Sequence, residues 1–533
     1  MNLTINWLAS LPLIIVLGAG VLGTLLEAFL PRSVRRLVQV VVSLLALAAA
    51  FVTIIWRWTD LSHQQTPGML RPLSIAQEAP FSGVAFVEDG FSVMGQAVIV
   101  LCALLSFMLI ADRTSLRDGA FVASAATRPG SAAERESTEA QREQTEIFPL
   151  ALFATGGMMA FVSAFDLLAM FIALELLSLP LYVLSATARR RRLLSQEAAL
   201  KYFLLGAFSS AIFLMGAAFI YGATGTLSFY GVAILAQQQQ ATVLFLAVGA
   251  IMLVIGLLFK VGAVPFHSWT PDVYQGAPTP ITGFMAAGTK AAAFIAMVRV
   301  FAWIVAVVPE SFQIFMWVII IATIVVGTVM GLVQDDVKRL LAYSSIAHAG
   351  FILIAVKSVL AHVNGVQLAA LGSIVFYLLA YGLATVGAFG VVTLVRSKDS
   401  DGNIGGEATK LSHWAGLGKT NPFLATAMVV FLLSFAGIPL TAGFIGKFEV
   451  FSTGIVAGNS VLVIIAIIAS VVTAFFYFRL IQLMFFTEPE TEQIEVVSSE
   501  GLSIVAISAA LAGTIVLGIF PSPVLNFITG IFQ

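Results

Sequence analysis

Apolar stretches of about 20 residues recur along the whole chain, separated by short polar segments. Each stretch can cross a hydrocarbon layer of roughly 30 Å as an α-helix, and none shows the strict polar–apolar alternation of a membrane β-barrel strand. The pattern therefore predicts an all-α, polytopic membrane protein. About fourteen spanning helices are expected, over residues 8–30, 37–56, 90–111, 147–164, 166–187, 197–220, 241–265, 279–303, 313–333, 340–360, 368–395, 422–446, 459–486 and 500–520.

Composition supports this fold class. Hydrophobic residues make up 59% of the 533 residues and charged residues only 10%, whereas about a quarter of a soluble domain is charged. The formal net charge of −1 offers no basic surface for nucleic acid. The expected surroundings are therefore a lipid bilayer, with no nucleic-acid partner.

The loop charges predict an orientation. One alternate set of loops holds 18 lysines and arginines, whereas the other holds only Arg57, Arg71 and Lys357. The positive-inside rule places the first set in the cytoplasm and both termini outside it. Because Met1–Trp7 lacks the basic region of a cleavable signal, the first helix is expected to be retained.

Two apolar segments are interrupted by glycine and proline: Lys260–Pro265 in the seventh helix and Ala436–Pro439 in the twelfth. Broken helices near charge, in corresponding positions of two halves, are typical of the ion path in inverted-repeat transporters; the alternative is a simple kink. A short internal match, Phe203–Gly206 with Tyr377–Ala380, also favours repeats. The expected organisation is a three-helix segment (1–111), a solvated, charged cytoplasmic loop (112–146), two inverted five-helix repeats (147–303 and 313–486) and a C-terminal helix (500–533).

Charged residues inside the predicted spans are the functional candidates, because an ionisable group near the bilayer centre costs roughly 2.5–3.5 kcal/mol and needs a partner or a role. Lys260 is the only charged residue of its 25-residue span, and Lys290 lies eleven residues into the next one. We expect both to have a functional role; the alternative is a structural one. Glu175 lies in the middle of the fifth span, where its expected partner is a lysine on a neighbouring helix; the alternative is a neutral, hydrogen-bonded carboxyl.

Four further residues are candidates, three of them with open alternatives. Lys201 lies nine residues beyond Arg192, so its side chain either joins the path or reaches back to the cytoplasmic interface. His348 suits a proton relay near neutral pH, or it is a satisfied core histidine. His267, at the first break, either relays protons or caps a helix end. Lys447 follows the second break.

No cofactor or metal is expected in this chain. The single cysteine, Cys102, excludes a cysteine-ligated iron–sulfur cluster, and no histidine pair has zinc spacing. The segment Gly18–Gly23 matches the dinucleotide-binding pattern, but no strand precedes it and no acidic residue follows at the required distance. We interpret these glycines as helix-packing residues.

Four stretches carry a family resemblance: Glu175–Leu184, Lys201–Phe208, Phe259–Tyr274 and Lys338–His348. They resemble the antiporter-like membrane subunits of bacterial NADH:quinone oxidoreductase (respiratory complex I), which are related to Mrp-type antiporter subunits. The resemblance covers about residues 85–490. It is closest to subunit N, since the twelfth helix carries a lysine rather than a glutamate and the chain ends at Gln533, without the long lateral helix of subunit L.

The resemblance implies a function and a site. The chain would be the proton-translocating part of a translocase enzyme in the respiratory chain of a bacterial inner membrane, coupled to quinone reduction elsewhere in the complex. NADH, FMN, iron–sulfur clusters and quinone would belong to other membrane-arm and peripheral-arm subunits, which are the expected partners. The proton path would involve Glu175, Lys201, Lys260, His267, Lys290, His348 and Lys447.

Other classes of function fit parts of the pattern. A subunit of a cation/proton antiporter or of a membrane-bound hydrogenase would share the buried lysines. A solute transporter would need a polar midplane cavity for its substrate, and a purely structural subunit would leave the buried charges without a purpose. The family resemblance favours the proton-translocating subunit of complex I.

Overall fold

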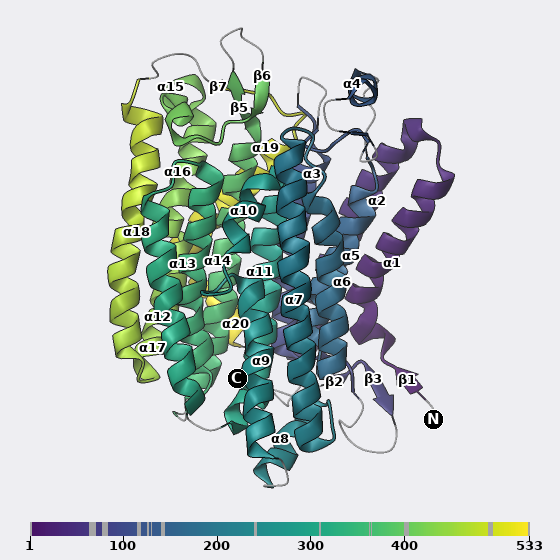
Figure 1. Cartoon of the computed structure of the whole chain (residues 1–533), viewed down its shortest axis with the longest axis vertical. Coiled ribbons are helices and arrows are strands. Elements are labelled where there is room, and N and C mark those ends of the chain that lie inside the picture. The colour runs from purple at the N-terminus through teal and green to yellow at the C-terminus, as the bar shows by residue number, and fades with distance from the viewer. Residues whose placement is uncertain are drawn as a thin grey trace.

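The structure, a computed structural model, is a bundle of helices that run roughly along its long axis (Figure 1). Strand β1 (Leu3–Ile5), where the described chain begins, and α20 (Ser522–Thr529), near its end, both lie toward the lower end of that view. The structure describes residues 3–62, 71–76, 84–114, 119–124, 127–128, 131–139, 144–238, 242–308, 311–361, 363, 365–398, 404–488 and 494–530.

Twelve helices of the described chain are long and apolar enough to span a membrane. They are α1 (Trp7–Phe29), α2 (Arg32–Ser62), α3 (Gly90–Ala111), α6 (Leu167–Ser185), α7 (Arg192–Thr224), α9 (Val243–Val261), α11 (Thr279–Trp303), α12 (Ser311–Leu332), α13 (Val337–Ser358), α14 (Val366–Leu394), α18 (Ser460–Phe486) and α19 (Leu502–Ile519). Two shorter apolar helices, α5 (Ile147–Ser163) and α16 (Pro422–Ala436), occupy the other two predicted spans. The multi-pass, all-α fold class is confirmed, while the count of fourteen spans stays a prediction.

The seventh and twelfth spans are interrupted where glycine and proline predict it. Helix α9 ends at Val261 and is capped by Gly262, which has a left-handed backbone (φ 74°); α10 (Trp269–Gly276) follows after Pro265. Helix α16 ends at Ala436 and is capped in the same way by Gly437 (φ 81°), before α17 (Ala442–Val456). Glycine reaches this conformation without steric cost and proline cannot extend a helix, so both spans stop inside the bundle.

Small antiparallel sheets lie at the two ends of the bundle. At the end where α1 begins, β1 pairs with β3 (Ser74–Ala76), and β2 (Arg71–Pro72) pairs with β4 (Val87–Glu88). At the other end, β5 (Val395–Lys398) lies between β6 (Ile404–Glu407) and β7 (Ile494–Val496). We call this second end the hairpin end; its loops belong to the set that the sequence places in the cytoplasm. The remaining short elements are α4 (Ala132–Glu139), α8 (Phe229–Gln237), α15 (Leu417–Thr420), η1 (Val305–Val307) and η2 (Leu411–Trp414).

The loop 112–146, which the sequence predicts to be solvated, is partly ordered against the bundle. Within it, Glu134 of α4 forms an ion pair with Arg192 at the start of α7 (2.7 Å). Phe121 forms an antiparallel bridge with Ala188. The described part of the loop therefore packs on the helices; residues 115–118, 125–126, 129–130 and 140–143 of the prediction lie outside the described chain.

Two neighbouring carboxylates fasten helices at the end opposite the hairpins. Glu88 holds Arg57 of α2, with Oε2 2.6 Å from Nη2. Asp89 caps α3 and accepts two hydrogen bonds from Arg299 of α11, at 2.9 and 3.1 Å. Arg57, which the sequence assigns to a loop, thus lies in an extended α2 and is buried.

Two of the three glycines of the dinucleotide-like segment, Gly20 and Gly23, are packing residues, as predicted, whereas a Cβ on Gly18 would meet open space. A Cβ on Gly20 would lie 3.0 Å from the ring of Phe153, and one on Gly23 would lie 3.2 Å from Pro149. Both neighbours belong to α5, so the small residues let α1 and α5 approach closely.

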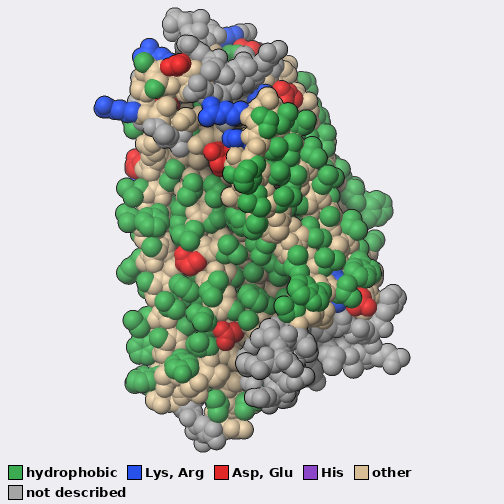
Figure 2. All heavy atoms as spheres, turned by 90° about the vertical axis from the view of Figure 1, so that its right-hand side faces the viewer, with side chains coloured by type: hydrophobic (Ala, Val, Ile, Leu, Met, Phe, Trp, Pro, Cys, Tyr) green, Lys and Arg blue, Asp and Glu red, His purple; other side chains and the backbone are tan. Residues whose placement is uncertain are grey.

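The outer surface is apolar over most of its height. On the face in Figure 2, hydrophobic side chains form a broad band, and most of the visible lysines and arginines gather above it, at the hairpin end. Large exposed side chains such as Phe208 and Phe478 contribute to the apolar surface of the molecule. A surface of this extent needs lipid or protein against it, in agreement with a multi-pass membrane protein.

Gly157→Ala should destabilise the fold, because a Cβ there would lie 2.7 Å from the carbonyl carbon of Leu176 and 2.8 Å from the Cα of Leu177. These are backbone atoms of α6 that cannot move aside, and overpacking costs about 1–3 kcal/mol. We expect a lower thermal midpoint in detergent, measured by loss of helical circular dichroism. Gly18→Ala is the matched control, since a Cβ there meets nothing within 4 Å; equal losses in both variants would contradict this account of the packing.

Candidate functional site

Lys260 lies in the last turn of α9, directly before the break, and is buried. Its Nζ donates a hydrogen bond to Ser178 Oγ (2.7 Å) and lies 3.5 Å from the hydroxyl of Tyr182, both on α6. The rings of Tyr182 and Tyr202 lie near the amine, with centroids at 5.5 and 5.7 Å. Hydroxyl oxygens and aromatic faces therefore take the place of water around this amine.

Glu175 lies on α6, three residues before Ser178, a spacing that places both on the same side of the helix. Its Oε1 is buried and has no hydrogen-bond partner, and the carboxylate forms no ion pair, among the described residues. Lys260 on α9 is the lysine that Glu175 interacts with through its charge. The two groups form no ion pair, because the Lys260 amine binds Ser178.

Lys201 lies apart from Lys260. Its Nζ forms ion pairs with Asp272 of α10 and with Glu197 of its own helix, both at 2.8 Å, and the side chain is 43% exposed. Since α7 begins at Arg192, Lys201 stands roughly two and a half turns from the hairpin end, within reach of the interface. Of its two predicted positions, the structure favours the interfacial one.

Lys290 lies in the middle of α11 and is buried. Its Nζ donates to the backbone carbonyl of Ser345 (2.6 Å) and also contacts the hydroxyl of that serine, on α13. The hydroxyl of Tyr274, on α10, lies 3.4 Å from Ser345 Oγ. The ring of Tyr381 lies near the amine, at 5.4 Å. Lys290 thus joins α10, α11, α13 and α14.

His348 lies three residues after Ser345 on α13 and has a hydroxyl at each ring nitrogen. Nδ1 is 2.7 Å from the hydroxyl of Tyr377, and Nε2 is 3.3 Å from that of Tyr477. The Tyr477 hydroxyl also lies 2.5 Å from Ser344 Oγ. His348 is thus a hydrogen-bonded core histidine, but both its nitrogens lie in a continuous set of polar contacts.

Lys447 lies on α17, after the second break, and is buried. Its Nζ donates to the carbonyl of Ala436 (2.9 Å), the last residue of α16, and to Ser470 Oγ on α18 (2.7 Å). The Phe351 ring lies 5.2 Å from the amine. Lys260 and Lys447 therefore share a setting: each adjoins a broken span and binds a serine of a neighbouring helix.

His267 lies in the turn between α9 and α10. Its Nδ1 is buried and has no hydrogen-bond partner among the described residues, and its backbone carbonyl accepts from Thr270. The structure brings it to the first break without a described contact to the Lys260 amine.

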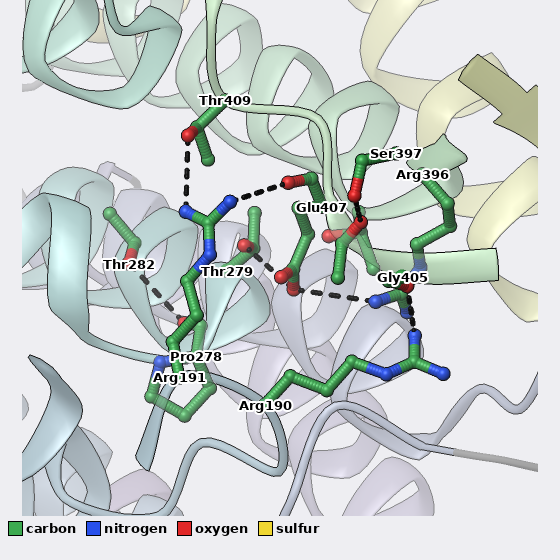
Figure 3. Close-up of polar contacts among 12 residues, drawn as sticks. Arg190, Arg191, Pro278, Thr279, Thr282, Arg396, Ser397, Gly405, Glu407 and Thr409 are labelled. Atoms are coloured by element: carbon green, nitrogen blue, oxygen red, sulfur yellow. Dashed lines mark hydrogen bonds and ion pairs between the residues drawn. The ribbon is translucent and has the colours of Figure 1, made fainter. Parts of the chain in front are cut away.

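A charged cluster at the hairpin end, drawn in Figure 3, joins loops from both halves of the chain. Glu407 of β6 accepts from Thr279, at the start of α11 (3.1 Å), and lies 3.8 Å from Arg396. Arg191 donates to the backbone carbonyl of Glu407 (3.1 Å). Burial raises the pKa of Glu407, but Arg396, Lys338 and Arg191 outweigh it and hold that pKa at about 2.

The sequence pattern points to the buried lysines and His348 but not to the hydroxyl groups around them. These hydroxyl groups contact a lysine amine or His348 directly, or through one further hydroxyl, and lie on Ser178, Tyr182, Tyr274, Ser344, Ser345, Tyr377, Ser470 and Tyr477. Spacing along the helix could have pointed to two of the serines. Ser178 follows Glu175 by three residues, Ser345 precedes His348 by three, and residues three apart share a helix face. Among the described residues, no group of three histidine, cysteine or acidic side chains could hold a metal.

This arrangement has a known counterpart. The sequence model described as NADH:quinone oxidoreductase/Mrp antiporter, TM matches residues 164–473, which include both broken spans and all three buried lysines of the site. The chain is thus an antiporter-like membrane protein, and its buried lysines lie within the matched region.

Similar proteins define the family more narrowly. The chain is 49% identical to NADH-quinone oxidoreductase subunit N of Beutenbergia cavernae, over 98% of this chain and 97% of that protein. A chain of respiratory complex I from Thermus thermophilus is 33% identical with a TM-score of 0.75, over 97% of this chain and 99% of that one. A chain of the Mrp complex from Dietzia matches with a TM-score of 0.77 at 20% identity, over 99% and 97% of the two chains, a likeness of fold alone. The protein belongs to the NADH-quinone oxidoreductase subunit N family.

Glu407→Gln should loosen the β5–β6 hairpin at neutral pH. Because the folded pKa is depressed, the carboxylate's contribution to stability is complete above its ordinary pKa of 4.5 and is lost as the pH falls through about 2. We expect lower amide-exchange protection in β5 and β6 of the variant at pH 7, and convergence with wild type as the pH approaches 2. Glu488→Gln removes an exposed carboxylate paired with Lys419 and should change nothing in the hairpin; wild-type protection in Glu407→Gln at pH 7 would refute the prediction.

Proposed function

We propose that this chain carries protons across a membrane as a membrane-arm subunit of an NADH:quinone oxidoreductase. The observation that carries the proposal is the set of three buried lysines, each bound to a serine of a neighbouring helix. Lys260, Lys290 and Lys447 lie on α9, α11 and α17, and the family match covers all three. Burying a row of amines in apolar surroundings costs free energy, so such a row indicates a function.

The partners of these lysines suit reversible protonation. Each amine is held by hydroxyl or carbonyl oxygens, and none of the three forms an ion pair among the described residues. A carboxylate in contact would hold an amine in its charged form. Hydroxyl groups can both donate and accept, so they bind either form of the amine. Each lysine can therefore lose and regain a proton without breaking a direct ion pair.

We assign the route by following these contacts through the bundle. Protons reach Lys260 from the cytoplasmic side, past Lys201 and His267 near the first break, while the charge of Glu175 biases the Lys260 amine. They continue to Lys290. Its partner Ser345 is next to Ser344 in the sequence, and Ser344 contacts Tyr477 beside His348. Bridging water fills the intervals between the protein groups.

The second half of the route uses His348 and Lys447. With a hydroxyl at each ring nitrogen, His348 can accept a proton at one nitrogen and release one at the other. From there the proton passes to Lys447 beside the second break and leaves on the outer side. The two inverted repeats, 147–303 and 313–486, place one broken span on each part of the route.

The energy comes from redox chemistry in other subunits. With one cysteine, the chain cannot ligate an iron–sulfur cluster through cysteines. By the family resemblance, NADH, FMN, iron–sulfur clusters and quinone belong to partner subunits of the membrane and peripheral arms. The excess of basic residues in one set of loops supports a cytoplasmic hairpin end and both termini outside, in a bacterial inner membrane. The similarity of fold to an Mrp chain fits an antiporter subunit too, but the much higher identity to named N subunits favours the oxidoreductase.

Lys260→Met should abolish proton transfer through this chain and lower the protons moved per NADH, while the complex still assembles and oxidises NADH. The measurement is proton uptake into inverted membrane vesicles driven by NADH, at matched complex abundance. Lys357→Met is the control, because this lysine is also buried but binds Asn459 (2.7 Å), away from the proposed route. An unchanged proton ratio in an assembled Lys260→Met complex would make the lysine structural and remove the basis of the proposal.

A further inference from the structure

The short helix α10 contacts the first lysine site through Trp269. The indole Nε1 donates to the carbonyl of Phe259, the residue before Lys260 (2.9 Å). The indole also stacks on Tyr202, with ring centroids 4.7 Å apart and planes 10° apart. Tyr202 packs edge-on against Tyr182, whose hydroxyl lies 3.5 Å from the Lys260 amine. One end of α10 therefore rests on the groups that surround Lys260.

The other end of α10 contacts the second half of the chain. The Tyr274 hydroxyl lies 3.4 Å from Ser345 Oγ, and Ser345 binds Lys290. Gln275 donates to Asp336 at the start of α13 (3.0 Å). An eight-residue helix thus reaches from the Lys260 site to the Lys290 site, a length of roughly 12 Å at 1.5 Å per residue.

Asp272 lies between these two ends and holds a cation from each half of the chain. Its Oδ2 is 2.8 Å from Nζ of Lys201 on α7, and its Oδ1 is 2.7 Å from Nη1 of Arg339 on α13. Each carboxylate oxygen therefore holds one helix. An asparagine would keep a single acceptor oxygen and would turn its amide hydrogens toward one of the two cations.

We propose that Asp272 is a positioning residue that keeps α10 in register with α7 and α13, so that α10 transmits a change of protonation at Lys260 to Lys290. This inference rests on the proposed function. Gain or loss of charge at Lys260 changes its attraction to the rings of Tyr182 and Tyr202. Those rings support Trp269, and the rigid helix passes the displacement to Tyr274 and Ser345. The two ion pairs of Asp272 keep the middle of α10 on α7 and α13 while this happens.

This role is separable from stability. The Asp272 side chain is 32% exposed and its partners are 43% and 27% exposed. Partly exposed ion pairs of this kind contribute little to global stability. Loss of the carboxylate should therefore leave the assembled complex intact and change the coupling between the two lysine sites.

The experiment compares variants of the whole complex in the vesicle assay, at matched complex abundance. Asp272→Asn should lower the protons moved per NADH to the value measured for Lys260→Met, and Asp272→Glu should restore the wild-type ratio. Arg339→Gln, which leaves the Lys201–Asp272 pair in place, should lower the ratio as well, whereas Arg339→Lys should not. Asp335→Asn removes a similar ion pair at the same end, to Arg479 (2.8 Å), and should pump like wild type because it does not involve α10.

The possible results separate the two proposals. A normal ratio in Asp272→Asn beside a lowered ratio in Lys260→Met would overturn the role of Asp272 and leave the proposed function standing. A normal ratio in Lys260→Met would instead contradict the proposed function itself. If the Asp272→Asn complex fails to assemble, the two Arg339 variants test the role instead. A wild-type proton ratio in Arg339→Gln would refute the positioning role of Asp272. A ratio that is lowered in Arg339→Gln and normal in Arg339→Lys would support it.

Discussion

A lysine amine inside a membrane has to find its hydrogen-bond acceptors in the protein, because the lipid offers none. Lys260, Lys290 and Lys447 meet this requirement with serines of neighbouring helices. A serine side chain is short, so each helix pair must approach closely and keep its register. Close helix contacts, such as the one where Gly157 of α5 meets the backbone of α6, therefore serve the polar interior as well as the apolar packing.

The broken spans follow from the same requirement. The middle of a regular helix uses its backbone carbonyls internally, whereas the last carbonyls of a helix have no partner within it. Ending α16 at Ala436 supplies such a carbonyl to Lys447 inside the bundle. Ending α9 near Lys260 leaves the Phe259 carbonyl for Trp269, which fixes the start of α10. In both cases a glycine with a left-handed backbone makes the interruption possible.

Much of the fold could be predicted from the sequence, because a membrane span needs a long apolar run and such runs are easy to recognise. The breaks at Gly262 and Gly437 were predictable as well, because a glycine closely followed by a proline interrupts a helix. The sequence also singled out Lys260 and Lys290, since a lone charge inside an apolar run is rare.

Contacts between distant residues could not be predicted in this way. Lys201 pairs with Asp272, 71 residues away, and that choice depends on where α10 lies after the break. The serines and tyrosines around the lysines do not stand out in the sequence. Unlike a charged group, a hydroxyl can be buried in a helix at little cost in free energy. The predicted lysine near Glu175 is Lys260, but the sequence could not show that its amine binds Ser178 rather than the carboxylate. The partial order of the loop 112–146 likewise depends on tertiary contacts, among them Glu134 with Arg192.

The adjacent serines of α13 have a consequence of their own. Successive residues of an α-helix point about 100° apart, so Ser345 binds Lys290 on α11 while Ser344 contacts Tyr477 on α18. Both contacts are formed together, and both depend on the rotation of α13 about its own axis. The two adjacent serines therefore tie the lysine site of one half of the chain mechanically to the histidine–tyrosine group of the other, so that neither contact can shift without disturbing its neighbour.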